Sequence, residues 1–155
     1  SIQYEQRKKY YFVGQRMETT FEKIGEVFST KMPKVKKELE NVQKETNITI
    51  RYQNCYREKP FEVDVGYIIS EDTFQKDQRI QQCKKEEEEG TWKLFPIPEG
   101  NYVIGTHRGS YAELTIVWDT IMKDMKNKKV CGQNSMEAIP QGEINHTYEI
   151  YTKGP

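Results

Sequence analysis

The amino-acid sequence predicts an α+β protein built from two degenerate copies of one β-α-β-β unit. Two observations support this fold class. Residues 95–118 carry, in order, the signals of a strand, a turn, a second strand and a helix, and residues 11–39 carry those of a strand and a helix. Glycines and apolar residues take matching places in the two segments. We therefore expect a single domain over residues 1–155, with pseudo-repeats at approximately residues 10–70 and 91–155.

The first copy follows a polar segment, Ser1 to Lys9, which we expect to be irregular. Tyr11 to Gln15 favours a strand, and Thr19 with Glu22 forms a capping box for a helix. Pro33 should kink or split that helix, because proline lacks an amide donor and clashes with the preceding turn. The apolar stripe of the helix consists of Phe21, Ile24, Phe28, Met32, Val35 and Leu39.

A hairpin and a charged joint complete the first half. Residues 48–56 alternate as a strand does, and residues 61–69 should return as the antiparallel partner. Glu71 to Gly90 is expected to join the two halves, and it ends in an acidic run at residues 86–89. Two interpretations of that run remain open, a site for a cation or basic partner and a solvated loop or frayed helix end. We assign it no function.

The second copy has clearer boundaries. A turn at Pro98 to Asn101 precedes a strand from Tyr102 to His107, which is rich in β-branched and aromatic residues. Ser110 and Glu113 form a capping box at the start of the second helix. The apolar stripe of this helix consists of Tyr111, Leu114, Trp118, Ile121 and Met125. Residues 144–152 should close the chain as a strand.

Composition and motifs exclude several classes of function. Lys plus Arg and Asp plus Glu each number 24, so overall charge predicts no direct binding to nucleic acid or membrane. Residues 1–14 do not read as a signal peptide and no apolar run could span a bilayer, so we expect a cytoplasmic location. The three cysteines stand far apart, and we expect no metal site and no cofactor. Catalytic motifs are absent, and we assign no catalytic residue.

Glu149 is the strongest candidate for a functional side chain. Alternate residues of a strand share a face, so Glu149 and Tyr151 point one way while Tyr148 and Ile150 point the other. If Tyr148 and Ile150 pack on the core, Glu149 faces the opposite side of the sheet. Aromatic rings around an acid are what a lipophilic cation needs, because the rings attract its charge and the acid compensates its desolvation. The candidate aromatic walls are Trp92, Tyr102, Tyr67 and Tyr151, although core packing would explain each equally well.

Longer motifs resemble a known family. The segment IPEGNYVIGTHRGSYAEL at residues 97–114, followed by the tryptophan-bearing helix and the closing YEIYTKGP, is similar to the GyrI-like small-molecule-binding domain. That domain is the effector-binding module of multidrug-responsive transcription activators and also occurs alone. The residues that match its pattern are Pro98, Gly100, Tyr102, His107, Gly109, Tyr111, Leu114, Glu149, Tyr151 and Pro155.

The resemblance implies one antiparallel sheet with two main helices on one face and a ligand groove on the other. It also implies that Glu149 is the family's buried acid, which meets cationic aromatic ligands, and that the chain acts as a sensor or sequestering module. A regulatory role would need a DNA-binding domain or partner protein that is not present in this chain. Two other interpretations remain open, a protein-interaction role such as topoisomerase inhibition and a hydrolase that uses Glu149 to activate water.

Overall fold

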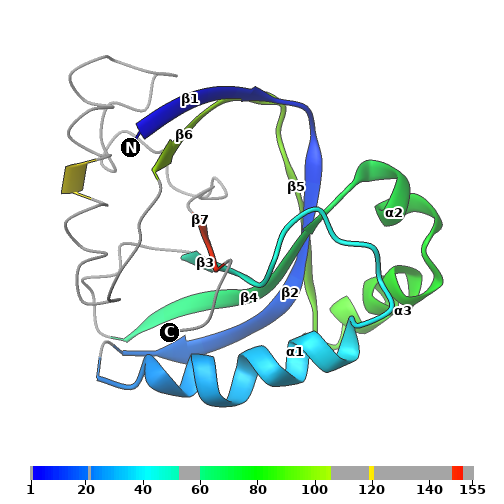
Figure 1. The fold of residues 1–155 in the computed structure, drawn as a ribbon. Helices are drawn as coiled ribbons and strands as arrows, with labels where there is room; N and C mark the ends of the chain where they lie inside the picture. Colours follow the sequence, from blue (N-terminus) through cyan, green and yellow to red (C-terminus); the bar gives the residue numbers. More distant parts are fainter. Residues whose placement is uncertain (1, 21, 53–59, 106–118, 121–147, 152–155) are drawn as a thin grey trace. The chain divides into compact units, whose positions relative to one another are not determined.

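A computed structural model describes residues 2–20, 22–52, 60–105, 119–120 and 148–151 of the 155-residue chain. It has antiparallel sheets with a few helices, which confirms the predicted α+β class (Figure 1). The chain divides into two compact units. The second predicted helix, which begins near Ser110, lies outside the described residues except for residues 119–120, which are helical, so the duplication stays a prediction.

The first unit contains a two-stranded antiparallel sheet formed by β1 (Ile2–Arg7) and β6 (Gly100–Gly105). Ile2 pairs with Gly105, and Arg7 pairs with Gly100 at the other end of the ladder. The expectation of an irregular segment before residue 10 was therefore wrong. Pairing with β6 satisfies the backbone of β1, and this outweighs the weak strand propensity of its polar residues.

The second unit is organised around a five-stranded antiparallel sheet with the strand order β5-β2-β4-β3-β7. Its strands are β2 (Tyr10–Thr19), β3 (Thr49–Tyr52), β4 (Phe61–Ile69), β5 (Lys93–Ile97) and β7 (Tyr148–Ile150). β3 and β4 form the predicted antiparallel pair. The described strands thus belong to two sheets and not to the single sheet that was expected. The reason is that β1 and β6 pair with each other and not with a strand of the larger sheet.

The predicted first helix is present, and its geometry changes at the proline. A π-helical turn, η1 (Val27–Lys31), leads into α1 (Met32–Glu38), in which Pro33 occupies the first turn. α1 continues from η1 without a break, since the Met32 amide donates to the Val27 carbonyl, and the change from π- to α-helical geometry coincides with the loss of an amide donor at Pro33. Before η1, Thr20 and not Thr19 accepts the Lys23 amide on its hydroxyl, at 3.3 Å.

Two short helices occupy the segment that we expected to be a joint. α2 (Glu71–Lys76) and α3 (Gln78–Glu87) follow each other closely. Ser70 accepts a hydrogen bond from the Thr73 amide, and Asp77 accepts one from the Ile80 amide, so each helix has a side-chain N-cap. The sequence did not identify these two helices, although the acidic run at residues 86–89 does lie at a helix end, one of the two interpretations left open for it.

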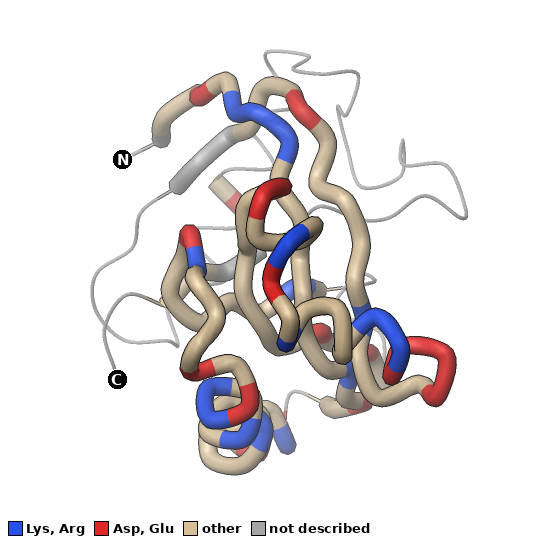
Figure 2. Tube along the Cα trace, turned by 90° about the vertical axis from the view of Figure 1, so that its right-hand side faces the viewer, with Lys and Arg blue, Asp and Glu red and all other residues tan. Residues whose placement is uncertain are grey.

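The core of the second unit lies between the sheet and its helices, and α1 runs along one face of the sheet (Figure 1). Odd-numbered residues of β2 and β4 contribute to this core, as alternation along a strand requires. Its fully buried side chains include Val13, Val27, Val35, Leu39, Ile50, Val63, Val65, Ile69, Ile80 and Trp92. Basic and acidic residues are both distributed along the described chain (Figure 2), in agreement with a formal net charge of zero.

Candidate functional site

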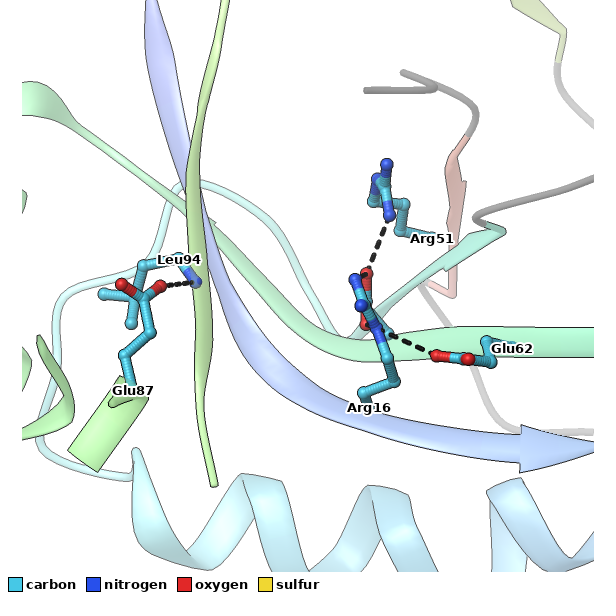
Figure 3. Close-up of polar contacts among 6 residues, drawn as sticks. Arg16, Arg51, Glu62, Glu87 and Leu94 are labelled. Carbon is cyan, nitrogen blue, oxygen red and sulfur yellow. Dashed lines mark hydrogen bonds and ion pairs between the residues drawn. The ribbon is translucent and has the colours of Figure 1, made fainter. Parts of the chain in front are cut away.

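The sheet face opposite α1 carries a cluster of charged residues from three adjacent strands. Asp64 on β4 pairs directly with Arg16 on β2 and with Arg51 on β3 in the two ladders. The Asp64 carboxylate accepts from Nε of Arg16 at 2.8 Å and from Nη1 of Arg51 at 2.8 Å (Figure 3). The side chains of Asp64 and Arg51 are 0% and 3% exposed. A buried acid therefore holds two guanidinium groups on this face, and we call these three residues the Asp64 cluster.

Arg16 connects the Asp64 cluster to its surroundings. Its Nη2 donates to Oδ2 of Asp64 at 3.2 Å, and its Nε lies 3.3 Å from a carboxylate oxygen of Glu62. The hydrogen bond to Asp64 raises the pKa of the Arg16 guanidinium further above its ordinary value, although partial burial acts in the opposite direction. The two arginines and two acids have formal charges that sum to zero, so the group is electrically balanced.

Two aromatic rings lie beside this cluster. Phe12 on β2 pairs with Phe95 on β5, and their rings stack with centroids 5.1 Å apart. The central guanidinium carbon of Arg51 lies over the Phe95 ring, 4.5 Å from its centroid. This distance is within the range of a cation–π interaction. The face thus combines a planar cation, an aromatic ring and a buried acid.

Glu149 lies on β7 at the edge of the same sheet, where its backbone pairs with that of Ile50. Ile50 is fully buried in the core. At the end of β7, the ring of Tyr151 packs against the core and meets Phe28 edge-on, with centroids 5.4 Å apart. Ile150, in contrast, is 41% exposed. The expected packing of Ile150 on the core was therefore wrong, because the register with β3 assigns Tyr151 and not Ile150 to the core side.

Two of the other predicted wall residues contribute to the core. Trp92 is fully buried, and its indole Nε1 donates to Glu86 at 2.7 Å. Tyr67 on β4 is 6% exposed, and burial raises the pKa of its hydroxyl. Core packing accounts for both positions, and contact of either ring with a ligand stays a prediction. Tyr102 belongs to the first unit, on β6, where it pairs with Glu5.

The Asp64 cluster was not identified from the sequence. The segment FEVDV at residues 61–65 signals a strand, and an acid at Asp64 is unusual for a strand that is buried on both faces. That signal would have marked Asp64 as a residue in need of a partner. Its partners Arg16 and Arg51 could not be assigned without the register of three strands.

Within the described ranges, no group of three or more His, Cys, Asp or Glu side chains is arranged to hold a metal ion. The helices of the described part are all too short or too polar to cross a membrane.

These features define a small α+β domain with one sheet face packed on helices and an aromatic and charged cluster on the other face. Residues 1–153 match the family model of the GyrI-like small molecule binding domain. The chain belongs to this family, and it is a small-molecule-binding domain over essentially its whole length. Comparison with curated proteins returned no match.

Proposed function

We propose that this domain binds lipophilic organic cations with aromatic rings, and that Glu149 supplies the counter-charge. In this role the protein acts as a sensor or as a sequestering module. As a sensor, it would transmit ligand occupancy to a DNA-binding domain or partner protein outside this chain. The family match supports binding of a small molecule in general terms. The chemical class of the ligand is our inference from the residues near β7.

The observation that carries this proposal is the position of Glu149 in the β3–β7 ladder. Its backbone pairs with that of Ile50, which is completely shielded from solvent. Two residues later, Tyr151 contacts Phe28. The strand that holds the acid therefore runs beside apolar and aromatic side chains.

Such surroundings suit an organic cation for two physical reasons. An acid beside apolar groups is poorly solvated, so an incoming opposite charge stabilises it more than it would in water. Aromatic rings add cation–π attraction and a large apolar contact area. A neutral ligand of the same shape would gain the contact area alone. Affinity should therefore depend on ligand charge.

The test uses a matched pair of ligands, the 2-naphthamidinium cation and the neutral amide 2-naphthamide, with binding measured by calorimetry. Glu149→Gln keeps the shape of the side chain and removes its charge, and it should weaken the cation by about 2–5 kcal/mol. Binding of the amide should change little. Glu88→Gln is the control, because Glu88 is an exposed acid at the end of α3. Equal losses for the cation and the amide would show that Glu149 is not a counter-charge.

A further inference from the structure

Arg51 makes the contacts that an organic cation would make if it were bound on this face of the sheet. Its guanidinium is planar and carries a delocalised positive charge. It lies over the Phe95 ring at 4.5 Å and donates to the Asp64 carboxylate at 2.8 Å. An aromatic ring together with a buried acid is the combination that holds a planar cation. We propose that Arg51 occupies a cation site formed by Asp64 and Phe95, and that a planar organic cation binds there by displacing the Arg51 guanidinium.

The acid would keep a partner after such a displacement. Arg16 donates to both carboxylate oxygens of Asp64, at 2.8 and 3.2 Å, and these hydrogen bonds do not involve Arg51. Replacement of the Arg51 guanidinium by a ligand of the same charge also leaves the total charge of the site unchanged. Removal of one guanidinium therefore does not leave Asp64 as an isolated buried charge, which would be costly.

Between the Phe12 ring and Asp64, β2 and β4 each carry a residue without a side chain. Along β2 and β4, the Gly14–Gly66 pair separates Phe12 from the Arg16–Asp64 pair. All of these residues have even numbers, and the even-numbered residues of β2 and β4 point to the face opposite α1. No side chain of this pair stands between the Phe12 ring and the Arg16–Asp64 pair, and the long side chain of Arg51 extends from β3 to the Phe95 ring on β5.

This site is distinct from the residues proposed above, although it lies near them. Arg51 pairs with Tyr148, the neighbour of Glu149 in the chain. The inference rests on the proposed function in one respect, the chemical class of the ligand. Asp64, Phe95 and Arg51 are identified from their own contacts.

A site that is filled by its own side chain binds ligand more weakly than an open one. The apparent dissociation constant rises in inverse proportion to the fraction of molecules in which the site is open. Removal of Arg51 should therefore tighten binding of a planar cation. If Arg51 fills the site in 90% of molecules or more, we expect a gain of about 10-fold or more.

The experiment compares Arg51→Gln with Arg16→Gln, using the 2-naphthamidinium cation and neutral 2-naphthamide. Both substitutions remove one guanidinium from Asp64, but only Arg51 lies over the Phe95 ring. Arg51→Gln should bind the cation about 10-fold more tightly than the unmodified chain, whereas Arg16→Gln should change affinity by less than about 3-fold. The neutral amide should bind all three proteins equally. No gain in Arg51→Gln, an equal gain in Arg16→Gln or an equal gain for the amide would overturn the proposal.

A second set of variants keeps the proposal testable if Arg51→Gln does not fold. Urea unfolding of the same samples shows whether each variant is folded. Arg51→Lys keeps a charge for Asp64 but loses the planar group over Phe95, so it should still give a gain of about 3-fold. Phe95→Leu in the Arg51→Gln background should abolish the gain. If Arg51→Gln does not fold and Arg51→Lys shows no gain, the proposal is wrong. The Glu149→Gln experiment tests the proposed function independently. Its loss of cation binding can be absent while Arg51→Gln binds the cation more tightly, and it can be present while Arg51→Gln shows no gain.

Discussion

Gly14 on β2 pairs directly with Gly66 on β4 in the five-stranded sheet, so that two residues without side chains oppose each other. A Cβ atom on Gly14 would lie 2.5 Å from the carbonyl oxygen of Val65, and one on Gly66 would collide with the carbonyl of Val13. Real Cβ atoms essentially never approach backbone this closely. The two strands therefore approach each other at a point where only glycine fits.

Gly14→Ala should destabilise the protein by about 1–3 kcal/mol, because the Val65 backbone and the buried Phe12 ring would both have to move. Gly25 offers a matched control, since it lies in the first helical turn with nothing within 4 Å of an added Cβ. Gly25→Ala should be neutral or stabilise by up to about 1 kcal/mol, through higher helix propensity. Urea unfolding of both variants measures these differences. Equal effects of the two substitutions would show that the Gly14–Gly66 approach is not tight.

Asp64→Asn should lower the free energy of unfolding by about 3–5 kcal/mol, because it leaves the buried Arg51 guanidinium without its carboxylate. Asp72→Asn is the control. Asp72 pairs with Lys76 at the same distance, 2.8 Å, but the two side chains are 73% and 77% exposed. Water and salt screen such a pair, so its loss should be far smaller. If the two substitutions cost equally little, burial does not strengthen the Asp64 cluster.

Cys83 should be unreactive in the folded protein. Its thiol is fully buried, and burial raises its pKa to about 11. At pH 8 only about one thiol in a thousand would then be ionised, and the alkylating reagent would also lack access. Mass spectrometry of the peptide that contains Cys83 should show iodoacetamide labelling in proportion to the unfolded fraction as urea is added. Rapid labelling without urea would contradict the buried position.

The same shift predicts a pH dependence of stability. The thiol has a higher pKa in the folded chain than in the unfolded chain, where the pKa is about 8.5. Its contribution to stability is therefore fully present below about pH 8.5 and is lost as the pH rises toward 11. The free energy of unfolding of the unmodified chain, relative to that of Cys83→Ala, should decrease across this range. A constant difference would show that the pKa of Cys83 is not raised by folding.

The sequence predicted those parts of the fold that depend on local periodicity. The apolar stripe through Met32, Val35 and Leu39 identified the face of the first helix that is buried, and Pro33 marked the change of helical geometry. α2 and α3 were missed because they are short, and because a single capping residue begins each of them. Helices of this kind depend on contacts from distant residues, such as the hydrogen bond from Arg79 of α3 to the Glu38 carbonyl at 3.3 Å.

The candidate site was predicted less well because it, too, depends on contacts between residues that are far apart in the sequence. Asp64 and Arg51 are 13 residues apart, and Arg16 is 48 residues from Asp64. These residues meet only because three strands pair in one particular register. A shift of one residue would move Asp64 to the core face, where neither arginine could reach it. Local sequence contains no information on that register. Of the four predicted aromatic walls, Tyr151 is the one that follows β7 directly, and its ring meets Phe28.

The different surroundings of Tyr151 and Ile150 give a direct test of the register of β7. Tyr151 packs on the core and meets Phe28, and its amide donates to the Ile48 carbonyl at 3.0 Å, which extends the pairing with β3. Ile150 pairs with Thr49, and its side chain is 41% exposed. Hydrophobicity alone would rank the isoleucine as the more buried of the two residues.

Tyr151→Ala should therefore cost about 1–3 kcal/mol of stability, less than the loss of a fully buried aromatic ring because the side chain is half-buried. Ile150→Thr keeps β-branching and strand propensity, and it should change stability by less than about 0.5 kcal/mol. Urea unfolding monitored by circular dichroism measures both. The reverse order of effects would mean that β7 pairs with β3 one residue out of the register described here, and that Glu149 then lies opposite Thr49 or Arg51 and not opposite Ile50.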